Sequence, residues 1–71
     1  MSTLSLEING GPVQLRDGAT VADAVRHVTG QVSPRGIAVA VNREVVPRSE
    51  WASTRLGPGC RVVVVEAAAG G

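Results

Sequence analysis

The sequence contains no phenylalanine, tyrosine or lysine, and only one tryptophan, one histidine and one cysteine. A single cysteine excludes an intrachain disulfide framework and a multi-cysteine metal site, which fits a reducing compartment. No apolar run approaches the roughly 20 residues that a membrane-spanning helix needs, and no secretory segment is recognisable. We therefore expect a cytoplasmic protein without a membrane-embedded part.

The chain also has almost no excess of either sign of charge. Seven arginines oppose six acidic residues, which leaves a formal net charge of +1. The arginines occur singly along the chain, whereas a nucleic-acid-binding surface needs a clustered basic stripe. The charge pattern therefore predicts no nucleic-acid partner.

Valine is what the sequence has in excess. Thirteen valines and nine alanines, with only four leucines and two isoleucines, must build most of the core of this 71-residue chain. β-Branched side chains fit a pleated surface and crowd a helix, so the composition favours strands over a helical bundle. The length allows one small domain.

Local patterns predict the first two elements. Leucine or isoleucine alternates with polar residues over 4–8, and the Asn-Gly-Gly-Pro sequence at 9–12 is typical of a turn, so we expect a β-hairpin over 3–16. A helix is expected to begin after the N-cap Thr20, paired with Asp23 in a capping box, and to end at Gly30. Its apolar face would contain Val21, Ala24, Val25 and Val28.

Three further strands follow in the sequence. Residues 37–41 alternate large and small apolar side chains, and Pro47 limits the short segment 45–46 to a sheet edge. The unbroken apolar run 62–65 is typical of a central strand covered on both faces. One helix across a mixed four- to five-stranded sheet is an α+β, β-grasp (ubiquitin-like) arrangement. We expect the domain to span 1–66, followed by a flexible tail at 67–71.

Intrinsic catalytic chemistry is not indicated. His27 falls on the polar face of the predicted helix near Asp23, and the acidic residues show no spacing that would bring two carboxylates together. Cys60 lacks a Cys-X-X-Cys partner, so a structural thiol is favoured over a redox-active one. Trp51 is interpreted as a lid on the core rather than a binding hot spot. One histidine and one cysteine cannot build a metal site, so no metal is expected.

The C-terminus is the remaining candidate site. Gly70 and Gly71 have no Cβ, so an extended tail can enter a channel too narrow for other residues. The terminal carboxylate could attack the α-phosphate of ATP in a partner's active site and become an acyl-adenylate that is open to a sulfur or nitrogen nucleophile. Because the Gly-Gly pair lies a few residues beyond the last strand of a predicted β-grasp domain, a reactive C-terminus is favoured over an accidental Gly-Gly end.

The sequence resembles the ThiS-type sulfur carriers of thiamine biosynthesis, within the ThiS/MoaD group of ubiquitin-like carriers. The resemblance covers essentially the whole chain and is most specific in Ala-Val-Ala-Val-Asn at 38–42 and Val-Val-Pro-Arg-Ser-Glu-Trp at 45–51. The second segment separates it from the small subunit of molybdopterin synthase. Other positions that match the pattern are Thr54, Leu56, Gly59, Arg61, Val62, Gly70 and Gly71.

The resemblance implies a protein cosubstrate rather than an enzyme. A ThiF-type, E1-like adenylyltransferase would activate the Gly71 carboxylate, with Ala69 and Gly70 threading into its active site. A cysteine desulfurase or rhodanese-like donor would supply the sulfur of a thiocarboxylate, and a ThiG-type thiazole synthase would receive it. The carrier itself would need no cofactor, because ATP belongs to the activating enzyme.

One departure from the family pattern suggests a docking surface. The family usually has Gly-Asp-x-Val-Glu-Val, and this chain has Gly-Cys-Arg-Val-Val-Val at 59–64. If Val62 and Val64 face the helix, an exposed Val63 replaces an outward glutamate and enlarges an apolar patch. We expect this partner-binding surface to contain Ala38, Ala40, Arg61, Val63 and Val65.

Two other interpretations are compatible with the sequence. A related carrier could feed molybdopterin, cysteine or a secondary metabolite with the same tail chemistry. A β-grasp interaction module that does not react would instead make the Gly-Gly end accidental.

Overall fold

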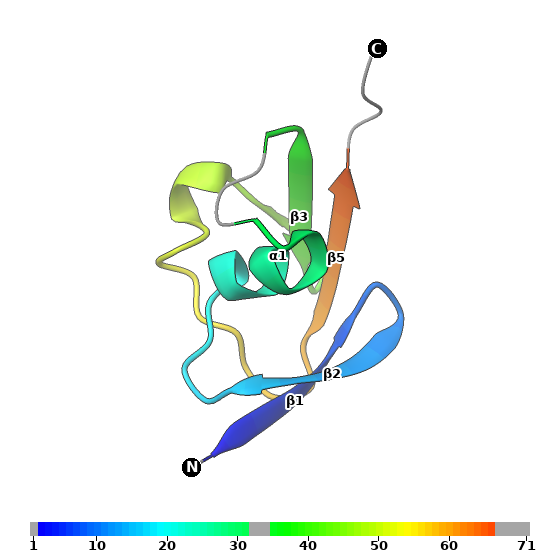
Figure 1. Ribbon diagram of the computed structural model, residues 1–71, viewed down its shortest axis with the longest axis vertical. Coiled ribbons are helices and arrows are strands. Elements are labelled where there is room, and N and C mark those ends of the chain that lie inside the picture. Colours follow the sequence, from blue (N-terminus) through cyan, green and yellow to red (C-terminus); the bar gives the residue numbers. More distant parts are fainter. Residues whose placement is uncertain (1, 32–34, 67–71) are drawn as a thin grey trace.

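The computed structural model describes residues 2–31 and 35–66, and within them it has five strands and one α-helix. The elements are β1 (Thr3–Ile8), β2 (Gly11–Arg16), α1 (Val21–Thr29), β3 (Ile37–Val41), β4 (Glu44–Val46), a 3₁₀ turn η1 (Arg48–Glu50) and β5 (Arg61–Glu66). The strands form one mixed sheet in the order β2-β1-β5-β3-β4 (Figure 1). This arrangement confirms the predicted β-grasp fold.

The hairpin and the helix form where their local signals lie. β1 and β2 pair antiparallel, with Ile8 opposite Gly11, across the two-residue turn formed by Asn9 and Gly10. At the start of α1 the backbone N–H of Thr20 donates to Asp23 Oδ2 at 2.8 Å, as a capping box requires. Gly30 ends the helix in the left-handed region, with φ of 75°. Each of these predictions is confirmed.

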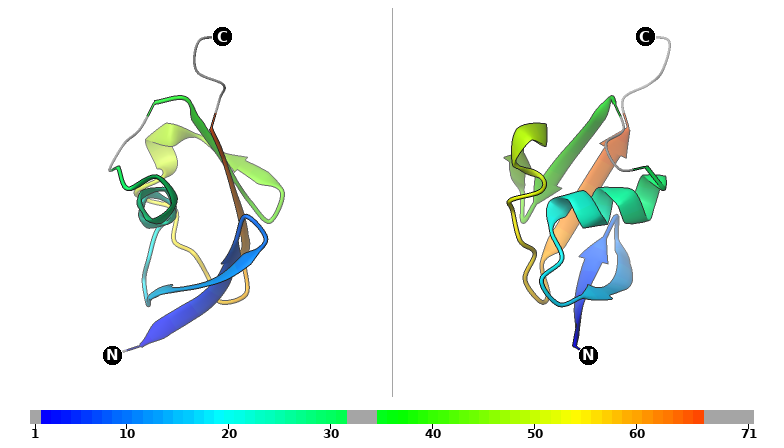
Figure 2. Two further views of the ribbon diagram at one scale, coloured as in Figure 1. Left: turned by 45° about the vertical axis from the view of Figure 1, so that its right-hand side comes forward. Right: turned by 60° about the vertical axis from the view of Figure 1, so that its left-hand side comes forward.

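β5 is the central strand of the sheet. It runs parallel to β1, with Ile8 opposite Val62, and antiparallel to β3, with Val39 opposite Val64. α1 lies on one side of the sheet, seen nearly end-on in the left view of Figure 2. Val62 and Val64 are buried on that side, whereas Val63 and Val65 are 42% and 54% exposed. The prediction that β5 is covered on both faces is therefore wrong: its apolar run has one buried and one exposed side.

The core lies between α1 and the sheet. Val21, Val25, Val39 and Val62 are its largest fully buried side chains. Trp51 closes it, only 4% exposed, and its indole Nε1 donates to the Val46 carbonyl at 3.0 Å. Val28, predicted to belong to the buried helix face, is 42% exposed, because in the last turn of α1 it borders a hollow instead of packed side chains on all sides. The lid role of Trp51 agrees with the prediction.

Two asparagines hold β5 from its two sides. Asn9 and Asn42 both have left-handed backbones, with φ of 51° and 49°. Asn9 donates its N–H to the Val62 carbonyl at 2.9 Å and accepts the Val64 N–H on Oδ1 at 2.8 Å. Asn42 makes the equivalent pair of bonds to the carbonyl and N–H of Arg61, at 2.8 and 2.9 Å. Each side chain thus satisfies a β5 donor that the neighbouring strand leaves unpaired.

Asn9→Ala is expected to lower the free energy of unfolding by about 2 kcal/mol. The substitution removes one hydrogen bond, worth roughly 0.5–1.5 kcal/mol, and places a Cβ-bearing residue without a local polar group in the left-handed region, at roughly 1–2 kcal/mol. Urea unfolding followed by circular dichroism measures the change.

The control is Asn9→Gly, which loses the same side-chain bond but tolerates the positive φ. The glycine variant should therefore be more stable than the alanine variant. Equal stabilities for wild type and the alanine variant would contradict the role of Asn9.

Candidate functional site

The face of the sheet opposite α1 carries an exposed apolar patch. The register places Ala40 opposite Val63 and Ala38 opposite Val65. Residues that lie opposite one another project to the same face of a sheet, so these four side chains share one face. Four of the residues predicted for the docking surface therefore lie together: Ala38, Ala40, Val63 and Val65.

Val45 extends this patch onto the edge strand, and sequence reasoning missed it. The register pairs Ala40 with Val45, and Val45 is 77% exposed, more than any other large apolar side chain of the described residues. We call Ala38, Ala40, Val45, Val63 and Val65 the open-face patch. The signal was present in the chain: the two-residue turn at Asn42 and Arg43 fixes which face Val45 must share.

Arg61, the fifth residue predicted for the docking surface, lies at one end of the patch. Its Nε is 3.2 Å from Glu7 Oε2, and the two side chains are 64% and 40% exposed. Such an exposed ion pair adds little to stability. It marks a polar border of the open-face patch, on the side away from the C-terminal end of β5.

The C-terminal end of β5 leads into the predicted reactive tail. Ala69, Gly70 and Gly71 lie outside the described residues, so their predicted roles stay predictions. Five residues follow Glu66, and a chain of that length reaches about 18 Å at most. A partner that acts on the terminal carboxylate must therefore come within that distance of Glu66, next to Val65 of the open-face patch.

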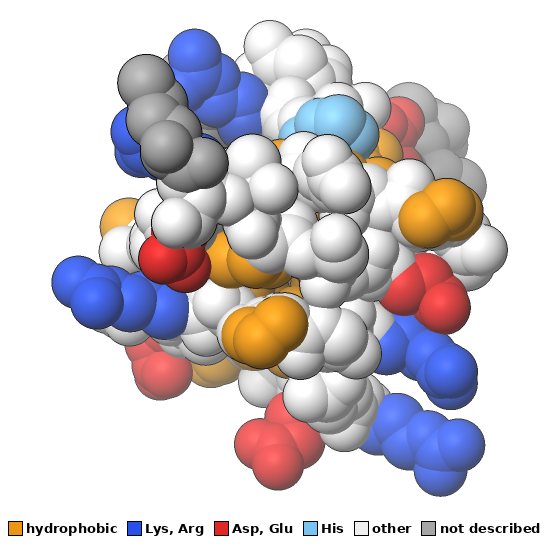
Figure 3. All heavy atoms as spheres, turned by 90° about the horizontal axis from the view of Figure 1, so that it is seen from below, with side chains coloured by type: hydrophobic (Ala, Val, Ile, Leu, Met, Phe, Trp, Pro, Cys, Tyr) orange, Lys and Arg blue, Asp and Glu red, His pale blue; other side chains and the backbone are white. Residues whose placement is uncertain are grey.

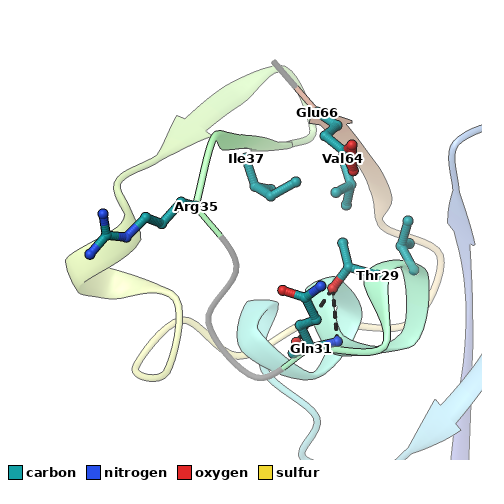
Figure 4. Close-up of a pocket in the computed structure, with 7 residues that line it drawn as sticks. Thr29, Gln31, Arg35, Ile37, Val64 and Glu66 are labelled. Carbon is teal, nitrogen blue, oxygen red and sulfur yellow. Dashed lines mark hydrogen bonds between the residues drawn. The ribbon is translucent and has the colours of Figure 1, made fainter. Parts of the chain in front are cut away.

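A hollow lies on the helix side of the same end. It has a volume of about 360 Å³ and is lined in part by Val28, Thr29, Ile37, Val64 and Glu66. In Figure 4, Ile37 and Val64 extend toward one another from neighbouring strands, and Arg35 points away. Gln31 and Arg35 also line the hollow, so this side of β5 presents a mixed polar and apolar surface, unlike the open-face patch.

The other candidate groups are not assembled into a site. His27 is exposed on α1, and Cys60 is only 7% exposed, in agreement with the structural role expected of its thiol. Among residues 2–31 and 35–66, no group of three or more histidine, cysteine, aspartate or glutamate residues could hold a metal ion.

Charged side chains of both signs share the face of the molecule shown in Figure 3. Viewed from below, arginines and acidic residues are interspersed around the rim of the molecule (Figure 3). On this face the two signs are mixed, as the arginines that occur singly along the sequence indicate. No helix in the described part of the chain is long and apolar enough to cross a membrane.

These features define a class of protein: a small β-grasp domain with one open sheet face and a Gly-Gly C-terminus. Within that class, the chain belongs to the ThiS family, whose model matches residues 6–71. The fold is similar to the crystal structure of the thiamine biosynthesis protein ThiS from Geobacter metallireducens, with a TM-score of 0.72 and 21% identity over 96% of this chain and 100% of that one. A comparison with curated proteins gave no match.

Proposed function

We propose that this ThiS-family protein carries sulfur as a thiocarboxylate on Gly71 and donates it for formation of the thiamine thiazole ring. The observation that carries the proposal is the Gly70-Gly71 terminus placed five residues beyond the central strand of a ThiS-family β-grasp domain. In this proposal the protein is a cosubstrate, and a ThiF-type, E1-like enzyme, a cysteine desulfurase or rhodanese-like donor, and a ThiG-type thiazole synthase act on it.

The proposed chemistry needs only the terminal carboxylate from this chain. One carboxylate oxygen attacks the α-phosphate of ATP, pyrophosphate leaves, and an acyl-adenylate forms. The outer sulfur of a persulfide on the donor then attacks the carbonyl carbon and displaces AMP, which gives an acyl disulfide. A second thiol attacks the donor's sulfur of this disulfide, so the thiocarboxylate leaves and a disulfide forms between the donor and that thiol. ATP and any metal ion are held by the activating enzyme. The two glycines allow the narrow approach because neither carries a Cβ.

Intact-mass spectrometry tests the proposal. The protein is incubated with a ThiF-type enzyme, ATP, a cysteine desulfurase and cysteine. The expected result is a mass gain that corresponds to exchange of one oxygen for one sulfur, dependent on ATP. An unchanged mass with several activating enzymes that charge their own carriers would contradict the proposal and favour a non-reacting interaction module.

The acceptor is tested with the charged protein. Incubation with a ThiG-type synthase and its other substrates should consume the thiocarboxylate and yield the thiazole. A charged carrier that this synthase leaves intact, while another sulfur-accepting enzyme discharges it, would assign the protein to molybdopterin, cysteine or secondary metabolism.

We further propose that the open-face patch docks the activating enzyme, and Val63→Glu tests this part. Val63 lies at the centre of the patch, opposite Ala40, and a glutamate there would bring an unpaired charge into an apolar contact. The rate of thiocarboxylation at low carrier concentration should fall at least about tenfold, which corresponds to about 1.4 kcal/mol. Because Val63 is 42% exposed in the free protein, the fold should persist.

Gln14→Glu is the matched control for charge. Gln14 is exposed and pairs with Ser5 at the other end of the sheet, away from the open-face patch. The Gln14→Glu variant should acquire the thiocarboxylate at the wild-type rate. Full activity of the Val63 variant would exclude Val63 from the docking surface without affecting the carrier function.

A further inference from the structure

We propose that the edge of β5 at Val64–Glu66 is a strand-addition site, where an extended segment of the activating enzyme pairs with the carrier beside its tail. The inference rests on the proposed function, because it assumes that a partner handles the residues beyond Glu66. It assigns that partner a main-chain contact in addition to the side-chain contacts of the open-face patch.

The hydrogen-bond pattern shows which groups of β5 face this edge. Successive residues of a strand direct their N–H and C=O groups to opposite sides. Arg61 uses both groups on the β3 side, with Asn42. Val62 and Val64 bond to Asn9 on the β1 side. By the same alternation, Val63 and Val65 face β3, and Glu66 faces the β1 side.

β1 ends too early to use the last of these groups. Its pairing with β5 stops at Ile8 opposite Val62, and the Asn9 side chain takes the Val64 N–H. Figure 1 shows β5 continuing past the β1–β2 turn with no described strand on that side. The Val64 carbonyl and the Glu66 N–H therefore face an edge that no strand within residues 2–31 and 35–66 occupies.

This spacing of an acceptor and a donor fits one residue of an added strand. In a parallel ladder, the residue opposite Val65 would donate its N–H to the Val64 carbonyl and accept the Glu66 N–H. β1 pairs with β5 in this way four residues earlier along β5, where Glu7 lies opposite Arg61 and its N–H donates to the Cys60 carbonyl at 3.0 Å. Addition of an extended peptide to an exposed sheet edge is a common recognition mode.

The position of the C-terminal tail indicates which partner would supply the added strand. Gly71 is the fifth residue after Glu66, so an enzyme that binds the Gly71 carboxylate must come within about 18 Å of the end of β5. Side chains of an added strand would alternate between the side of the open-face patch, next to Val65, and the helix side, next to the exposed Val28. An extended segment with apolar side chains toward the open-face patch and mixed side chains toward the helix side fits these surroundings.

Glu66→Pro tests the proposal because it removes the outward N–H while the β3 ladder keeps its donors. Proline also holds Val65 in the extended region that a strand requires. Glu66→Ala removes the same side chain but retains the N–H, and it is the reference for the proline variant. Circular dichroism and urea unfolding establish that both variants fold.

The dissociation constant for the ThiF-type enzyme, measured by titration calorimetry without ATP, is expected to be at least about fivefold higher for the proline variant than for the alanine variant. Hydrogen exchange followed by NMR supplies a second readout on the wild-type chain. The Glu66 amide should exchange at least about tenfold more slowly in the complex, whereas the Val63 and Val65 amides are protected already in the free protein.

Equal affinities of the two variants, or an unchanged exchange rate at Glu66 in the complex, would overturn strand addition. The mass gain of the wild-type chain keeps this outcome separate from the proposed function. A carrier that is charged normally but shows no protection at Glu66 would retain its function and lose only the strand-addition site.

Discussion

Deletion of Gly71 is expected to abolish thiocarboxylation by the activating enzyme, with no measurable mass gain under conditions that charge the wild-type chain fully. The deleted chain still ends in a carboxylate, that of Gly70, but this group lies about 3.5 Å short of the wild-type position. Displacement of a reacting group by even about 1 Å can lower a rate by about 100-fold. The unfolding midpoint in urea should not change, because β5 ends at Glu66.

Deletion of Ala67 instead of Gly71 separates the length of the tail from its chemistry. This variant keeps Gly-Gly at the end and shortens the tail by the same amount. Failure of both variants would show that reach from Glu66 is decisive, and failure of the Gly71 variant alone would show that the terminal dipeptide is. A normal mass gain after deletion of Gly71 would refute the assignment of that residue as the sulfur-bearing end.

Replacement of Trp51 by alanine should destabilise the domain by about 3–5 kcal/mol, the range observed when large buried aromatic residues are truncated. The side chain is 4% exposed, and its loss would also leave the Val46 carbonyl without the indole donor. A domain of 71 residues has a total stability of about 4–11 kcal/mol. The variant should therefore lose a large part of that stability, as measured by urea unfolding followed by circular dichroism.

Trp51→Phe is the matched variant for this residue. It retains most of the apolar surface and loses the hydrogen bond to Val46, so a cost of about 1–3 kcal/mol is expected. A loss below 1 kcal/mol for the alanine variant would show that Trp51 does not close the core.

The elements that could be predicted from sequence are those with local causes. The Asn-Gly turn at 9–10 fixes the hairpin, and the capping pair of Thr20 and Asp23 with Gly30 fixes both ends of α1. The open side of β5 followed from alternation once Val62 and Val64 were assigned to the core. The exposure of Val28 could not be predicted, because it depends on how closely other segments pack against the last turn of α1.

The candidate site also contains both features with local causes and features that depend on tertiary contacts. The terminal Gly-Gly is visible in the sequence because its chemistry resides in the residues themselves. Val45 became part of the open-face patch only through its pairing with Ala40, and the two asparagine contacts to β5 join residues up to 55 positions apart. The asparagine contacts have no local signal, because they join segments far apart in the sequence, whereas the place of Val45 follows from the short turn at Asn42 and Arg43.

The central position of β5 has a mechanical consequence. A partner that draws on the residues beyond Glu66 pulls along a strand bonded to β1 on one side and β3 on the other. Force in that direction loads the hydrogen bonds of both ladders together, in shear, instead of opening them one after another. The bonds from Asn9 to Val62 and Val64 and from Asn42 to Arg61 add to this resistance. This geometry favours resistance to unfolding when the C-terminal end of β5 is pulled along the strand direction.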